Sequence, residues 1–256
     1  MTDTTTTIGV QLSTAEAWTL MRLMRLPGIP GLLLPPQDIL DHEGMNAVDQ
    51  LMLDSLRARG IVHVRSDGDT PTVSIDKTTG ALLGTGAICD YWLTLSVEAA
   101  DAEHVTYIYF SPHLSVIHSQ PQPNLHLFSA ASSGDILFSA IYSGLALDNI
   151  NVPSNALSWI FDHQFLANIA IQSTEEIAQQ MAEIGIESEI AWRLAVAMHS
   201  VKRRISQQFR QTEEITGVQV LTDGQTYFLC IPQADGIRIE TVNTPQVIEA
   251  VMQFIR

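Results

Sequence analysis

The C-terminal stretch from Gly217 to Ile255 constrains the fold most, because its strands and turns can be assigned almost residue by residue. Asp223-Gly224 and Asp235-Gly236 each separate two β-rich runs, and glycine there accepts the positive φ that a tight turn requires. After the third run, apolar residues recur at helical spacing at Val247, Val251 and Ile255. The stretch predicts an antiparallel meander followed by an amphipathic helix, and it carries no residues typical of catalysis.

Two Ser-Thr-x-Glu sequences predict the starts of helices. In Ser13–Glu16 and Ser173–Glu176 the serine can cap the helix while the glutamate three residues on binds back to the serine amide. The first follows an alternating run at 8–12, and the second follows an alternating run at 165–171, so both runs are predicted to be strands.

The remaining elements complete an α+β pattern. A helix through Met45 and Leu56 is expected to end at Gly60. Residues 76–89 are ambiguous because three glycines weaken a helical assignment. The further strands are predicted at 61–65, 72–75, 91–97, 105–110, 114–118, 125–129, 136–142 and 203–210. Strands and helices in blocks predict an α+β fold with a mostly antiparallel sheet and flanking helices.

The order of elements suggests a division of the chain. Residues 1–7 are expected to be a disordered leader, followed by an N-terminal half at 8–150 and a C-terminal half at 151–256, packed as one globular unit. Both halves run strand, capped helix, second helix and antiparallel strands. An internal duplication, which would make the halves pseudo-symmetric, stays open because the apolar phase of the two opening strands differs by one residue.

Composition restricts the partners. The net charge of −15 disfavours nucleic acid and anionic membranes, which offer no counter-charge. Only 16% of residues are charged, against about 25% in a typical soluble domain, so either the surface is rich in neutral polar residues or a partner covers an apolar face. No signal peptide or membrane-spanning run is recognised, which predicts a cytoplasmic protein. Cys89 and Cys230 are expected to be buried thiols, with a disulfide between them left open.

No motif fragment indicates an active site or a cofactor. Ser74–Lys77 and Lys77–Gly80 resemble two elements of penicillin-recognising enzymes, but here they overlap on one lysine. The glycines of Gly80–Gly86 match neither phosphate-binding pattern, and close packing explains them better. Three strand histidines, His113, His118 and His126, lack a nearby Cys or carboxylate to complete a zinc set.

Two segments are candidates for contact with a protein partner. The apolar run Ile29, Leu32 and Leu33, within the Pro-rich link at 27–36, either closes the core or forms an exposed lip for a partner. Asp67 and Asp69 fit a hairpin turn better than a metal site. We predict these five residues as partner-binding positions.

Taken as a series of elements, the chain resembles the EspG-type chaperones of type VII secretion in actinobacteria. The resemblance lies in Trp18 of the first helix, in Arg57-x-Arg59-Gly60 before Ile61-Val62, and in the closing meander, Val218–Tyr227 with Asp235-Gly236. It implies a non-enzymatic α+β protein with two pseudo-symmetric halves that holds the tips of secreted helical heterodimers in the cytoplasm. The family's hairpin loop is usually longer than Ser66–Pro71.

The sequence therefore supports a non-catalytic protein that binds a helical partner. An enzyme, or a ligand- or metal-binding protein with a site around His113, His118, His126 and the Gly80–Gly86 segment, is the alternative. A third hypothesis is a subunit of a larger assembly whose acidity steers a basic partner.

Overall fold

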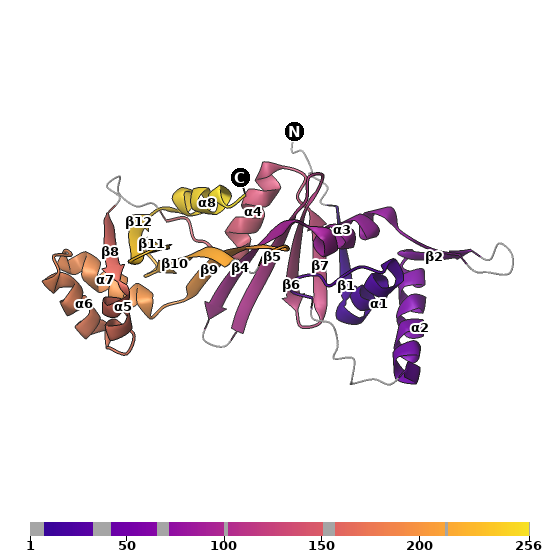
Figure 1. Ribbon diagram of the computed structural model, residues 1–256, viewed down its shortest axis with the longest axis horizontal. Helices are drawn as coiled ribbons and strands as arrows, with labels where there is room; N and C mark the ends of the chain where they lie inside the picture. The colour runs from indigo at the N-terminus through magenta and orange to yellow at the C-terminus, as the bar shows by residue number, and fades with distance from the viewer. Residues whose placement is uncertain are drawn as a thin grey trace. The chain divides into compact units, whose positions relative to one another are not determined.

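The computed structural model describes residues 8–32, 42–65, 72–99, 102–150, 157–212 and 215–255. In this part of the chain there are eight helices, a ten-stranded antiparallel sheet and a two-stranded antiparallel sheet (Figure 1). The predicted α+β class is confirmed. The predicted leader, residues 1–7, lies outside the described residues.

The chain forms two compact units. Unit 1 comprises residues 1–92 and 106–134, and unit 2 comprises residues 93–105 and 135–256. The strands β4 (Tyr91–Ala99) and β5 (Ala102–Phe110) are divided between the units, because residues 93–105 belong to unit 2. The division expected between residues 150 and 151 stays a prediction about the two halves of the chain.

Unit 1 begins with a strand and two helices, and continues into a meander. Besides the divided strands β4 and β5, its elements are β1 (Gly9–Ser13), α1 (Thr14–Met24), α2 (His42–Ala58), β2 (Val62–Arg65), β3 (Thr72–Ile75), α3 (Lys77–Ile88), β6 (Ser115–Gln122) and β7 (Leu125–Ala130). The strand order is β1-β7-β6-β5-β4, and the β2–β3 hairpin forms the small sheet.

From β8 onward, unit 2 has a similar order of elements: a strand, then helices, then a meander. Its elements are α4 (Gly134–Gly144), β8 (Ser158–Asp162), α5 (His163–Ile169), α6 (Thr174–Glu183), α7 (Ser188–Met198), β9 (Lys202–Phe209), β10 (Ile215–Thr222), β11 (Tyr227–Gln233), β12 (Gly236–Val242) and α8 (Thr244–Gln253). The strand order β9-β10-β11-β12-β8 mirrors that of unit 1. In each half the opening strand, β1 or β8, pairs antiparallel with the last strand of the meander. This shared topology supports the predicted pseudo-symmetric halves.

Most predicted elements are present, including both capping boxes and the C-terminal meander. The left-handed glycines Gly60 and Gly224 lie where the sequence predicted a helix end and a turn. The ambiguous stretch at 76–89 is the helix α3, because Asp76 caps it by accepting a hydrogen bond from the Thr79 amide.

Two predicted strands are wrong. Residues 136–142 belong to α4, where Leu137 and Ile141 are buried at a helical spacing of four. The run at 165–171 lies mostly in α5, and the true strand β8 precedes it; Asp162 ends this strand and caps α5 through the Phe165 amide. The counterpart of Ser13 is therefore Asp162, which removes the phase difference that weighed against an internal repeat.

Glu16 joins α1 to α2 in unit 1. Its carboxylate accepts hydrogen bonds from the Ser13 amide, the Ser55 hydroxyl and the Arg59 guanidinium, all between 2.8 and 2.9 Å. Burial alone would raise the pKa of Glu16, but these donors outweigh it and the pKa is lowered. The side chain that caps α1 thus also fixes the end of α2.

Each unit has its own apolar core. In unit 1, α1 and α3 bury residues such as Leu20 and Leu83 against Tyr109 and Phe128 of the sheet. In unit 2, Met181 of α6 and Leu194 of α7 pack against one face of the sheet, which contributes Phe161, Phe228 and Ile239. Cys89 and Cys230 are buried free thiols, as predicted, so they form no disulfide.

Candidate functional site

Two of the three strand histidines meet inside unit 1. His118 on β6 and His126 on β7 lie with Nε2 and Nδ1 2.9 Å apart. The third, His113, is exposed in the turn before β6 and does not join them. The sequence could not pair the two, because a bulge between β6 and β7 sets their register.

The two rings belong to a continuous hydrogen-bonded chain. The Tyr109 hydroxyl lies 2.6 Å from both the Pro30 carbonyl and His118 Nδ1, and His126 Nε2 lies 2.9 Å from Thr14 Oγ1. If Tyr109 donates to Pro30, each neutral ring donates from Nδ1 and accepts at Nε2, and every contact then holds one proton. The chain connects the Pro-rich link, the sheet and the start of α1.

Burial keeps this histidine pair neutral. His118 is 1% exposed and stacks on Phe128 with ring centroids 4.3 Å apart. Burial, with a smaller contribution from His126, lowers the pKa of His118 to about 3, and burial also lowers the pKa of His126. Because both nitrogens of each ring are already hydrogen-bonded, neither ring offers a free lone pair to a metal. Within the described ranges, no group of three or more His, Cys, Asp or Glu side chains could hold a metal ion.

The glycine-rich segment at 80–86 lies in the interior of the helix α3. A Cβ on Gly86 would lie 3.1 Å from Ile29 and 3.2 Å from the Tyr109 ring. The absence of a side chain at Gly86 therefore allows close packing, which was the favoured interpretation from the sequence.

The predicted partner-binding residues separate into two groups. Ile29 and Leu32 are each 3% exposed and belong to the core of unit 1, as expected if the link closes the core. Leu33, Asp67 and Asp69 lie outside the described residues. Contact of these positions with a partner stays a prediction.

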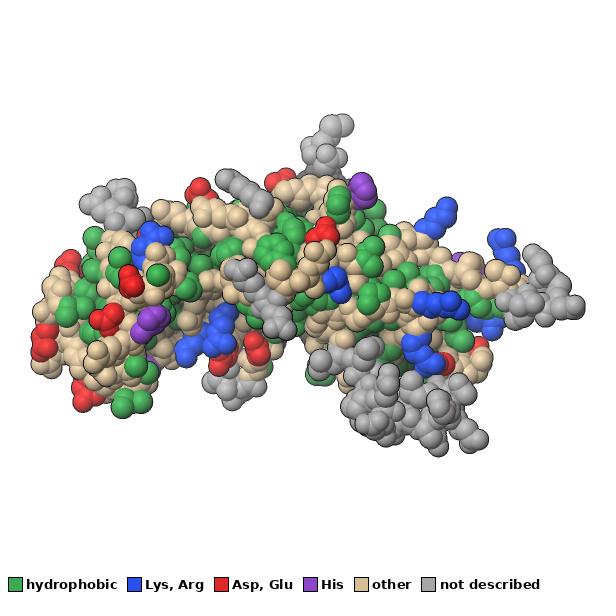
Figure 2. All heavy atoms as spheres, in the orientation of Figure 1, with side chains coloured by type: hydrophobic (Ala, Val, Ile, Leu, Met, Phe, Trp, Pro, Cys, Tyr) green, Lys and Arg blue, Asp and Glu red, His purple; other side chains and the backbone are tan. Residues whose placement is uncertain are grey.

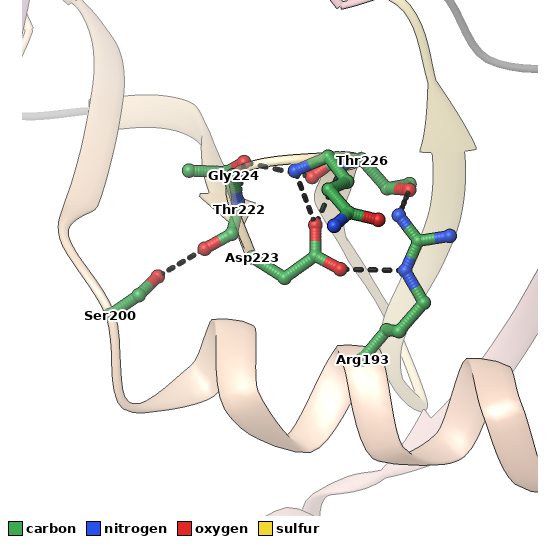
Figure 3. A network of polar contacts seen from close by, with 7 residues as sticks. Arg193, Ser200, Thr222, Asp223, Gly224 and Thr226 are labelled. Atoms are coloured by element: carbon green, nitrogen blue, oxygen red, sulfur yellow. Dashed lines mark hydrogen bonds and ion pairs between the residues drawn. The ribbon is translucent and has the colours of Figure 1, made fainter.

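In unit 2, a polar network anchors α7 to the β10–β11 turn (Figure 3). Arg193 Nε donates to Asp223 Oδ2 at 2.6 Å, and its Nη2 donates to the Thr226 hydroxyl. Asp223 Oδ1 accepts from the amides of Gln225 and Thr226 and so shapes the turn itself. Burial alone would raise the pKa of Asp223, but Arg193 and the two amides lower it. The sequence predicted the turn but held no signal for its helical partner.

Three large apolar side chains near the helices α6 and α7 are exposed. Ile171, Ile184 and Trp192 are 92%, 57% and 46% exposed. They lie before α6, at its end and in the second turn of α7. The exposure of Trp192 could have been recognised in the sequence, since this residue lies off the apolar face of α7 that carries Leu194 and Ala197. Nothing near these three residues resembles a catalytic centre.

Comparisons with known proteins bear on the fold. No protein-family model matches the chain, and no curated protein sequence matches it. In the described residues no helix is long and apolar enough to cross a membrane.

One solved structure that the chain resembles is the Mycobacterium tuberculosis type VII secretion system chaperone EspG5 in complex with a PE25-PPE41 dimer.

This match has a TM-score of 0.68 at 12% sequence identity and covers 96% of this chain and 95% of that one. Similarity at this level of identity concerns the arrangement of helices and strands and leaves the function open. It confirms the structural side of the resemblance predicted from the sequence. The chain therefore has the fold of the type VII secretion chaperone EspG5.

Proposed function

We propose that this chain is a non-catalytic cytoplasmic chaperone or adaptor that holds a helical partner protein. The observation that carries the proposal is the match to EspG5 over nearly the whole of both chains, in a structure where EspG5 is bound to the PE25-PPE41 dimer. The partner is accordingly proposed to be a secreted helical protein or heterodimer with an apolar end that needs cover before export.

Composition and exposure are compatible with this role. The chain has 16% charged residues, fewer than a typical soluble domain, and large apolar side chains are exposed at the end of α6 and on α7. We propose these helices as a main contact. Asp67 and Asp69, which lie in the sequence between β2 and β3, stay proposed partner-binding positions. Ile29 and Leu32 are buried in the core of unit 1, and the contact of the run Ile29, Leu32 and Leu33 with a partner stays a prediction.

The alternative of a histidine-centred enzyme or metal site loses its support. His118 and His126 are engaged with each other and with Tyr109 and Thr14, and the glycine segment forms a packed helix. Of the residues that the alternative needed, His118, His126 and the glycine segment therefore already have structural partners.

The direct test is affinity capture of the tagged chain from its native host, with bound proteins identified by mass spectrometry. A stoichiometric helical partner, lost when the apolar end of that partner is mutated, supports the proposal. Capture of the chain alone, under conditions that preserve other complexes of the host, counts against it.

A further inference from the structure

The turn between α6 and α7 presents a local apolar surface. Ile184 follows the last residue of α6, and Trp192 lies in the second turn of α7. Helical side chains lean toward the N-terminus of their helix, so Trp192 leans toward the turn that begins at Ile184. Both residues are about half exposed, at 57% and 46%. We call these two residues and the segment between them the α6–α7 turn surface.

Acidic side chains surround this surface. Glu183, Glu187 and Glu189 are exposed, and Glu189 shares a face of α7 with Trp192, three residues on. On the face drawn in Figure 2, red and green side chains lie side by side at the left end, where Figure 1 labels α5, α6 and α7. Between residues 163 and 201 the only Lys or Arg is Arg193, and Asp223 holds it.

These carboxylates lack the cations that pair with three acids of unit 1. In unit 1, Asp49 is paired with Arg22, Asp54 with Arg57 and Glu16 with Arg59. Within the described part of the chain, no ion pair involves Glu183, Glu187 or Glu189. Their negative potential is therefore uncompensated, and it extends over an apolar patch where a partner's cations would be drawn close.

We propose that the α6–α7 turn surface binds a helical segment whose apolar residues are flanked by Lys or Arg. The apolar side chains of this segment would cover Ile184 and Trp192, and its cations would face Glu183, Glu187 and Glu189. The proposal rests on the proposed function and adds the charge of the partner to it. Attraction between uncompensated acids and flanking cations accelerates association and selects this partner over one with acidic flanks.

Two synthetic helical peptides of equal length and equal apolar face, one flanked by Lys and one by Glu, test the proposal. Binding to the full chain is measured by fluorescence anisotropy of the labelled peptides. At about 0.05 M salt the Lys-flanked peptide is expected to bind at least about tenfold more tightly. At about 0.5 M salt, where the Debye length falls to roughly 4 Å, this preference should largely disappear.

Matched variants locate the effect. Neutralising the turn surface with Glu183→Gln, Glu187→Gln and Glu189→Gln is expected to remove most of the preference. The same change of charge elsewhere on unit 2, with Glu103→Gln, Asp235→Asn and Glu249→Gln, all exposed, should preserve it. Trp192→Ala should weaken the binding of the Lys-flanked peptide about tenfold. Phe138→Ala on α4, where Phe138 is 47% exposed, should not.

Equal affinity for the two peptides, or an equal loss in the two neutralised variants, would overturn the proposal. A partner captured from the host that binds the neutralised turn variant as tightly as the wild type would also overturn it while leaving the proposed function standing. Absence of any host partner bears on the proposed function, and the peptide preference is measured independently of it.

Discussion

Glu16 and Arg59 form an ion pair, 2.8 Å between Nη1 and Oε2, that uses the capping carboxylate of α1 to hold the end of α2. Glu176 occupies the equivalent capping position of α6 but is exposed and has no cation among the described residues. The same local capping motif therefore includes a tertiary ion pair at Glu16 but not at Glu176. This difference provides a matched pair of variants.

Glu16→Gln should destabilise the protein much more than Glu176→Gln. Glutamine preserves the capping box at both positions, so only the first change removes a charge from a buried ion pair. We expect a loss of about 2 kcal/mol for Glu16→Gln, below the roughly 3–5 kcal/mol of a fully buried pair because Arg59 is partly exposed. For Glu176→Gln the expected loss is below about 0.5 kcal/mol. Urea unfolding of both variants measures the difference, and equal losses would refute the account of Glu16.

The buried histidine pair should make unit 1 sensitive to acid. The unfolded chain takes up a proton near pH 6.5, whereas the pKa of His118 in the folded chain is about 3. Between these values the unfolded state binds more protons, so stability falls as the pH falls, by up to about 1.4 kcal/mol per pH unit for one such group. Urea unfolding between pH 6.5 and 5, above the range where carboxylates titrate, measures this slope.

Variants at His118 and His113 test whether the buried pair causes this dependence of stability on pH. His118→Gln should unfold more easily at pH 7 because it breaks the chain from Tyr109 to His126, but its stability should depend less on pH. His113→Gln, at an exposed position, should keep the wild-type slope. A wild-type slope in the His118 variant would show that other groups cause the acid sensitivity.

Gly31→Ala should be far more damaging than Gly28→Ala, although both glycines lie in the Pro-rich link. Gly31 has a φ of +75°, and a Cβ there would lie 2.1 Å from the Tyr107 ring. We expect a loss of at least about 2 kcal/mol. A Cβ on Gly28 would meet no atom within 4 Å, so alanine there should change stability by no more than about 1 kcal/mol. Thermal unfolding of the two variants checks this, and similar melting temperatures would contradict the placement of the link.

The two cysteines should be unreactive in the folded protein. Cys89 is fully buried, and burial raises the pKa of Cys230 to about 12, so the thiolate that reacts with Ellman's reagent is scarce. Two thiols per chain should be titrated after denaturation without reductant, and neither within the same time in native buffer. Fewer than two in the denatured chain would reveal a disulfide that the structure excludes.

The accuracy of the sequence-based predictions follows the range of the interactions involved. Capping boxes, left-handed glycines and Asp-Gly turns depend on neighbouring residues, and Ser13, Gly60 and Gly224 are all predicted correctly. Alternation is a weaker signal over short runs: Phe165, Ala167 and Ile169 suggest a strand, but the cap at Asp162 makes this segment a helix.

Contacts between distant segments could not be predicted. The pairing of His118 with His126, of Arg193 with Asp223 and of Glu16 with Arg59 depends on register and packing, which a single sequence does not encode locally. Exposure is hard to predict for the same reason. For Ile29 and Leu32 the sequence left burial and exposure open, and both are buried, whereas the exposure of Trp192, which lies off the apolar face of α7, was not predicted.

The central claim is that the chain keeps a helical partner soluble. The measurement that tests it most directly is expression of the captured partner alone and together with the chain, followed by light scattering of the soluble fraction. The account predicts that the partner aggregates alone and elutes with the chain as a complex of defined stoichiometry. A partner that is equally soluble without the chain, or that never enters a complex of defined mass with it, would contradict the account.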